Sequence, residues 1–300
     1  MNPIMFKNIL CPIDRSPSSL QSFDRAIAIA RWQGARLHLL EVIESVVSPG
    51  GSVSPKQAGV LNEARVALEK DLRQMLVSRR ASDVKVEIVM REGNVVREIL
   101  AQASDSRADL LVIGSHGRGG VQRLVLGSVA EKVLRQATCP VLTIRRGVSR
   151  PRRNRSPFKT ILCATDLSAA GNNAVAFAKR LARAAAARLI VMSAVEWPFG
   201  VPVTSGPIAE LQEVLETNAR KALALQLPKP RAGQPAAKAV VVHGNASAAI
   251  VKLARARSAD LIVMGVSGRG AVDVVLLGST THHVIRRGEW PVLTVPPGTR

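Results

Sequence analysis

The stretch Asp109-Leu110-Leu111-Val112-Ile113-Gly114-Ser115-His116-Gly117 joins an apolar run to a glycine-rich loop, and Gly127-Ser128 follows after a nine-residue spacer. The loop therefore has the pattern G-x2-G-x9-G-S. Glycine permits a left-handed backbone and close approach to an anion, and the start of a following helix adds unpaired N–H donors. The pattern indicates a phosphate-binding loop. It returns 151 residues later, at Gly265, Gly268, Gly278 and Ser279.

The segments around the two loops repeat as well. Apolar runs predict strands over residues 7–14, 37–43, 84–90, 109–113 and 139–144, and again over residues 159–166, 189–195, 240–242, 260–264 and 290–295. Helical periodicity predicts helices between residues 16 and 34 and over residues 57–78, 95–103, 128–136, 173–185 and 208–225. Charged Lys85 and Glu87 alternate with apolar residues along residues 84–90, which predicts a strand that is exposed on one side and lies near a sheet edge. Strands that alternate with helices predict an α/β fold with a parallel sheet covered on both faces.

A basic, proline-containing connector separates the two copies. We predict a first domain over residues 1–147, a basic linker over residues 148–157 and a second domain over residues 158–300; the two domains are called the first and second repeat below. The linker contains Arg150, Arg152, Arg153 and Arg155. A run of this kind is typical of a solvated linker, although docking of a polyanion such as a nucleic acid stays open as an alternative.

The composition of the 300 residues narrows the class of protein. A hydrophobic content of 47% with 21% charged residues is typical of a globular protein, and the apolar runs are too short to span a membrane. The first ten residues lack a secretory pattern, so we predict a cytoplasmic protein. The net charge of +20 predicts only nonspecific attraction to nucleic acids, because an aromatic content of 3% leaves few residues for base stacking. Three cysteines without CxxC spacing predict buried thiols.

An acidic residue ends the first strand of each copy, at Asp14 and Asp166. Ligands of open parallel sheets bind beyond the carboxyl ends of the strands, where such a residue can meet a ribose hydroxyl or a Mg²⁺ ion held by phosphates. The chain has no Walker A lysine. Phosphates would therefore be held by backbone amides, by Ser128 and by Arg118.

These motifs resemble those of a tandem universal stress protein, of the subclass that binds ATP through G-2x-G-9x-G-(S/T). The resemblance covers both copies of the repeat. It implies two Rossmann-like (adenine nucleotide alpha hydrolase-like) domains, each a five-stranded parallel sheet of order 3-2-1-4-5 with helices on both faces. It also implies that the fifth strands meet at the domain interface, and that two chains form a homodimer.

The resemblance also assigns residues to an adenine nucleotide, ATP or its di- or monophosphate, with Mg²⁺. Asp14 and Asp166 would lie beside ribose and adenine, with Ile13 and Thr165 next to them and with Mg²⁺ within reach. Val42 and Val195 would read the adenine edge through their backbone. The phosphate loops would contain Gly114, Gly117, Arg118, Gly127 and Ser128 in the first repeat, and Gly265, Gly268, Arg269, Gly278 and Ser279 in the second.

Simpler interpretations exist for the same residues. The glycines can serve a tight turn, the aspartates an Asx-turn and the serines a helix cap. His116 has no counterpart in the second repeat, where Ser267 stands, so we expect no catalytic role for it. The favoured function is an ATP-binding stress-response module or sensor with two intact sites. The alternatives are a slow ATPase with at most weak hydrolysis, or a nucleic-acid-associated protein that acts through its linker.

Overall fold

The computed structural model describes residues 5–44, 55–116, 126–145, 147, 156–196, 207–227, 235–266, 277–287 and 289–299. The first repeat contains β1 (Asn8–Ile13), α1 (Pro17–Gln33), β2 (Arg36–Ile43), α2 (Pro55–Ser78), β3 (Lys85–Glu92), α3 (Val95–Asp105), β4 (Leu110–Gly114), α4 (Ser128–Gln136) and β5 (Val141–Ile144). The second contains β6 (Thr160–Ala164), α5 (Ala169–Ala185), β7 (Arg188–Val195), α6 (Pro207–Gln226), β8 (Lys238–His243), α7 (Ala246–Ala256), β9 (Leu261–Gly265), α8 (Ser279–Arg287) and β10 (Val292–Val295).

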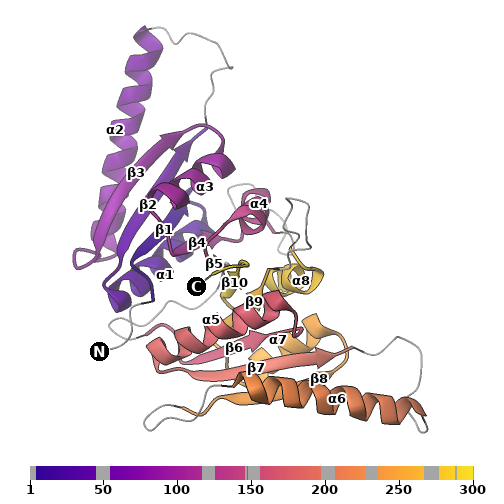
Figure 1. The fold of residues 1–300 in the computed structure, drawn as a ribbon. Helices are drawn as coiled ribbons and strands as arrows, with labels where there is room; N and C mark the ends of the chain where they lie inside the picture. The colour runs from indigo at the N-terminus through magenta and orange to yellow at the C-terminus, as the bar shows by residue number, and fades with distance from the viewer. Residues whose placement is uncertain are drawn as a thin grey trace.

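The described strands form one continuous sheet of order β3-β2-β1-β4-β5-β10-β9-β6-β7-β8. All neighbours are parallel except β5 and β10, which pair antiparallel at the centre of the molecule (Figure 1). The α/β fold with parallel strands is confirmed, and the two expected sheets are joined into one. The strand over residues 85–92 lies at a sheet edge, as its charge alternation indicates.

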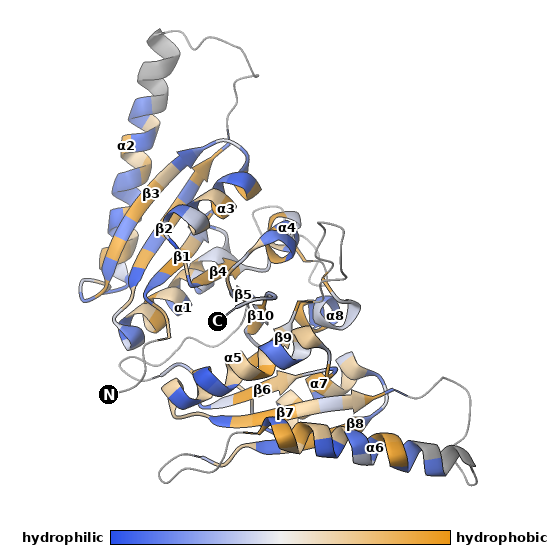
Figure 2. Cartoon of the chain, in the orientation of Figure 1, coloured by the Kyte–Doolittle hydropathy of each residue, from blue (hydrophilic) through white to orange (hydrophobic). Residues whose placement is uncertain are grey.

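Helices cover both faces of the sheet, so the core has two layers. One layer lies between the sheet and α1, α2, α5 and α6, with Phe23, Leu72, Phe177 and Leu223 among its buried side chains. The other lies between the sheet and α3, α4, α7 and α8 and contains Ile99, Val133, Ile250 and Val284. Figure 2 shows hydrophobic stretches along the strands and both hydrophobic and hydrophilic residues on α1 and α5. Burial of this apolar surface is the main stabilising contribution.

Aromatic side chains join the two repeats on the α1 and α5 side of the sheet. Phe6 packs on Phe177 with ring centroids 6.3 Å apart, and Trp32 meets Phe158 edge-on at 6.1 Å. At the strand junction, the Thr294 hydroxyl donates a 3.2 Å hydrogen bond to the carbonyl of Val141. Both core layers continue across this junction, so the two repeats share one hydrophobic core.

Most element boundaries differ by one or two residues from those that the sequence predicts, and the start of α5 differs by four. Helix α5 begins at Ala169 rather than at residue 173, because the Ser168 hydroxyl accepts a 3.1 Å hydrogen bond from the N–H of Gly171 and caps the helix early. Strand β8 is longer than residues 240–242, because its Lys238–His243 backbone pairs with β7.

The prediction of buried thiols is confirmed, since all three cysteines are buried. Burial raises the pKa of Cys139 to about 11 and raises the pKa values of Cys11 and Cys163 further.

None of the helices in the described ranges is both long and apolar enough to cross a lipid bilayer.

Candidate functional site

A cavity of about 1400 Å³ lies at the carboxyl ends of β1, β2 and β4 in the first repeat. It reaches across the edge of the sheet, because residues of α2 line one side and residues of α3 and α4 line the other. The predicted site residues that line it are Ile13, Asp14, Val42, Gly114, Gly127 and Ser128. The fold thus brings together residues from four separate segments in a hollow large enough for a nucleotide.

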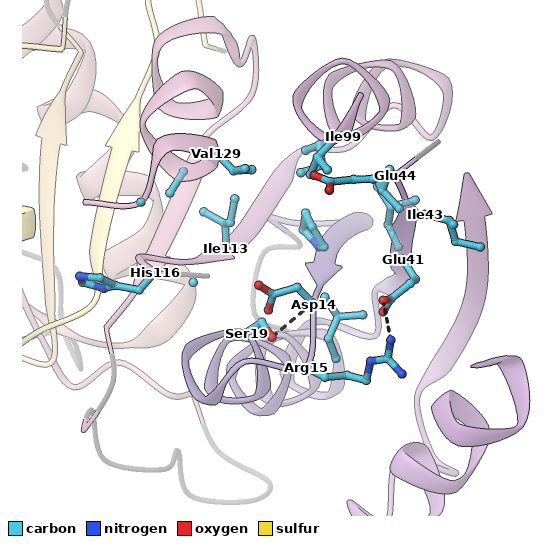
Figure 3. Close-up of a pocket in the computed structure, with 18 of the residues that line it drawn as sticks. Asp14, Arg15, Ser19, Glu41, Ile43, Glu44, Ile99, Ile113, His116 and Val129 are labelled. Atoms are coloured by element: carbon cyan, nitrogen blue, oxygen red, sulfur yellow. Dashed lines mark hydrogen bonds and ion pairs between the residues drawn. The ribbon is translucent and has the colours of Figure 1, made fainter. Parts of the chain in front are cut away.

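Asp14 turns the chain from β1 into α1. Its Oδ1 accepts a 3.0 Å hydrogen bond from the N–H of Ser16, so the Asx-turn considered for this residue is present. The turn holds Arg15 in the left-handed region, at φ 63°. Asp14 is nevertheless half-buried and lines the cavity, as Figure 3 shows. A turn and a ligand contact are compatible for this carboxylate, because it has two oxygens.

Gly114 is needed for close packing rather than for an unusual backbone angle. A Cβ at this position would lie 2.9 Å from Ser18 Oγ and 3.0 Å from the backbone nitrogen of Ser19, at the start of α1. The hydroxyl groups of Ser16 and Ser18 donate hydrogen bonds to the carbonyl of His116. The glycine therefore lets the first turn of α1 lie directly against the end of β4. Of the two properties of glycine that the loop pattern draws on, the left-handed backbone does not occur at Gly114.

The start of α4 faces the cavity without a side-chain cap. Gly127 is the N-cap residue, and its own N–H donates a 2.8 Å hydrogen bond to the carbonyl of Ser115. Ser128 is the first helical residue and does not cap the helix, so the capping interpretation is not supported for it. The first amides of a helix can bind an anion, and the Ser128 hydroxyl lies beside them.

The cavity also contains an ion pair that the motifs do not reveal. Arg15 Nη2 lies 3.2 Å from Glu41 Oε1, and the Glu41 side chain is only 4% exposed (Figure 3). Glu41 lies within a largely apolar strand. A carboxylate in such a strand indicates a buried, paired charge, and this was the one sign of the ion pair in the sequence. The left-handed backbone at Arg15 has no signal in the sequence.

Carboxylates dominate the charge of the described cavity wall. Those that line it are Asp14, Glu41, Glu44, Asp71 and Glu131, against the single guanidinium of Arg15. Among the residues with described positions, no three His, Cys, Asp or Glu side chains converge on a metal site. The described wall therefore offers little positive charge to a polyphosphate, which would need cations that it carries itself.

The universal stress protein family model matches residues 5–145 and again residues 157–296. The chain belongs to the universal stress protein family. A universal stress protein of Mycolicibacterium smegmatis is 30% identical over 298 residues, covering 96% of this chain and 97% of that protein. One from Methanocaldococcus jannaschii is 33% identical over 144 residues, which cover 47% of this chain and 84% of that protein.

A solved structure shares the whole arrangement. The crystal structure of a universal stress protein from Archaeoglobus fulgidus aligns with a TM-score of 0.68 at 22% identity, covering 97% of this chain and 98% of that one. This likeness shows a common fold. The chain is therefore a universal stress protein with two family domains in tandem.

The second domain of this universal stress protein repeats the turn but not the lining of the cavity. Asp166 Oδ1 accepts a 3.1 Å hydrogen bond from the N–H of Ser168, and Leu167 has φ 64°. Ser279 lines a cavity of about 370 Å³ together with Glu196, Asn245, Ser247, Thr280, His283 and Arg287. The other described site residues of this repeat, Thr165, Asp166, Val195, Gly265 and Gly278, are not part of that lining.

Strand register shows that Val42 and Val195 are not equivalent. Pro12 pairs with Leu40 and the matching Ala164 pairs with Met192, which places Ala194 opposite Val42 in the repeat. The N–H of Gly93 donates to the Ile43 carbonyl, and that of Gly244 donates to the Val195 carbonyl. Val195 therefore corresponds to Ile43, on the opposite side of the strand. The alignment of the valines was wrong by one residue.

The remaining predicted site residues, Gly117, Arg118, Gly268 and Arg269, lie outside the described residues.

Proposed function

We propose that the cavity of the first repeat binds an adenine nucleotide, ATP in preference, and that the protein is a nucleotide-dependent stress-response module or sensor. The observation that carries this proposal is the single cavity that unites Asp14, Val42, Gly114, Gly127 and Ser128. The uncapped start of α4 suits the phosphates and Asp14 suits the ribose.

The proposed site needs a divalent cation. ATP has about four negative charges near neutral pH, and the described wall adds five carboxylates. Mg²⁺ bound to the phosphates would offset part of this repulsion, with Asp14 within reach of the ion. We expect ATP to bind much more weakly in EDTA than with Mg²⁺, by isothermal titration calorimetry. Equal affinity in the two conditions would remove the role of Mg²⁺.

The same proposal extends to the second repeat at lower affinity. Its motif contains Asp166, Gly265, Gly278 and Ser279, but the described residues line a much smaller cavity. We therefore propose one strong site in the first repeat and a weaker one in the second.

The direct test is nucleotide release. Protein that is purified and then heat-denatured should release ATP, ADP or AMP, detected by chromatography, and protein stripped of nucleotide should bind ATP again. If the denatured protein releases no nucleotide and the native protein binds none in calorimetry, the proposed function is wrong.

A further inference from the structure

The Arg15 and Glu41 pair forms part of the cavity wall next to the proposed nucleoside position. Arg15 directly follows Asp14, and Glu41 directly precedes Val42, so the pair adjoins both residues that the family resemblance assigns to the nucleoside. Arg15 has a side-chain exposure of 39%, whereas Glu41 has 4%. The guanidinium is thus accessible to a ligand, and the buried carboxylate of Glu41 holds it in place.

Strand geometry fixes the side of the sheet on which the pair lies. Val42 packs with the core layer of α3 and α4. Because successive side chains of a strand point to opposite faces, Glu41 points toward α1 and α2. Arg15 therefore covers the α2 side of the cavity, opposite the start of α4 where the phosphates would bind.

The second repeat lacks both members of the pair. Leu167 follows Asp166 with nearly the same left-handed backbone as Arg15, at φ 64° against φ 63°. By strand register, Ser193 occupies the position of Glu41. The fold of the turn therefore does not depend on this ion pair, since the turn forms without it in the second repeat.

We propose that Arg15 stacks on the face of the nucleotide base and that Glu41 is a positioning residue that holds its guanidinium flat. This inference rests on the proposed function of the first cavity. A guanidinium paired through its edge leaves its planar face available, and such a face packs on aromatic rings. Contact with a phosphate is disfavoured, because Glu41 offsets the charge of the guanidinium and Arg15 lies on the side of the cavity opposite the start of α4. The ligand class is a nucleotide with a planar, aromatic base.

The experiment compares ATP with inorganic tripolyphosphate, which lacks base and ribose. Calorimetry on the full chain with Mg²⁺ would measure both ligands for the wild type and for the double variant Arg15→Leu/Glu41→Ser, which introduces the residues of the second repeat. ATP affinity should fall about 3- to 30-fold, and tripolyphosphate affinity should stay within about twofold. Arg15→Lys should lose nearly as much ATP affinity, because an ammonium group has no planar face.

A matched control removes another paired arginine of the first repeat. Arg31 pairs with Asp83 at 2.5 Å and lies outside the cavity lining, so Arg31→Leu should leave both affinities unchanged. Unchanged ATP affinity in the double variant would overturn the inference, as would an equal loss for ATP and tripolyphosphate. If the folded wild type binds neither ligand, the proposed function fails together with the inference.

Discussion

The turns that follow β1 and β6 have the same backbone, yet the cavities beyond them differ. In both repeats an aspartate closes an Asx-turn and the next residue is left-handed, at φ 63° and φ 64°. The side chains that project from this shared frame differ. The counterparts of the carboxylates Asp14, Glu41, Glu44, Asp71 and Glu131 are Asp166, Ser193, Glu196, Ala222 and His282.

This difference shows that a shared backbone does not imply a shared binding surface. Arg15 and Glu41 are charged and line a large cavity, whereas Leu167 and Ser193 cannot form an ion pair. The motif glycines and serines are the same in both repeats. They therefore indicate the backbone that the repeats share, and they do not predict which other side chains line each cavity. The residues between the motifs decide how much space and charge each site has.

The largest expected effect comes from the aspartates. Asp14→Asn retains an oxygen for the Asx-turn but removes the charged acceptor proposed for the ribose hydroxyl and the charge within reach of Mg²⁺, so binding of Mg²⁺-ATP should weaken about 10- to 150-fold, the contribution of a hydrogen bond to a charged group. Asp166→Asn is the matched control and should leave the strong site intact. Calorimetry of both variants tests this, and the comparison fails if Asp166→Asn causes the greater loss.

The next effect concerns the glycines that end β4 and β9. A Cβ on Gly265 would lie 2.6 Å from the carbonyl oxygen of Ala170, whereas a Cβ on Gly114 would approach backbone atoms of Ser18 and Ser19 only to 3.0 Å. The closer backbone contact cannot be relieved by a side-chain rotation, so Gly265→Ala should lower the free energy of unfolding more than Gly114→Ala, by about 1 to 3 kcal/mol. Urea denaturation measures both, and equal stabilities would show that the two junctions are equally tolerant.

A smaller expected effect is a pH dependence of stability that arises in the first repeat. Burial lowers the pKa of His38 below its ordinary value of 6.5, although the Glu87 carboxylate opposes part of the shift. Because the folded pKa lies below the unfolded one, the unfolded state gains protons first, and this contribution to stability is lost as the pH falls through 6.5 toward the folded pKa.

Ile190 occupies the position of His38 in the second repeat. His38→Ile should therefore reduce the loss of stability between about pH 7.5 and about pH 5, measured by urea denaturation at each pH. A variant with the same pH dependence as the wild type would show that His38 does not contribute to it.

The smallest effect concerns the helices at the outer flanks. In the second repeat, His243 Nε2 lies 2.9 Å from Glu216 Oε2, and its Nδ1 lies 3.0 Å from Gln212 Nε2, so β8 is tied to α6. His243→Ala should speed hydrogen exchange in α6 and leave exchange in α2 unchanged. Exchange that is unaffected in α6 would mean that packing of the buried Leu223 alone holds the helix.

Much of the fold was predictable because most strands are short apolar runs and several strand-to-helix junctions have a capping residue or a glycine. Ser16 and Asn94 cap helices that the sequence predicts to begin at these positions, and Asn245 caps α7 in the same way. The position of Asp14 at the cavity was predictable too, since parallel strands deliver their last residue to one edge. These features are local or follow from strand direction.

The features that could not be predicted from the sequence depend on strand register and on packing between segments far apart in the chain. The equivalence of Val195 with Ile43 follows only from strand pairing, because a shift by one residue is invisible in two apolar strands. The pairing of Arg15 with Glu41 joins residues 26 positions apart through a left-handed turn. The role of Gly114 depends on the approach of α1, which no local pattern specifies.

The antiparallel pairing of β5 with β10 has a consequence for how the two sites diverge. Two identical chains that met along this edge would carry identical sites, and each substitution would appear twice. Here both partners of the edge belong to one polypeptide, so the pairing forms at any dilution and always unites unlike halves. The covalent link thus keeps two different halves paired within one chain. Substitutions can therefore change the cavity of one half without changing the cavity of the other.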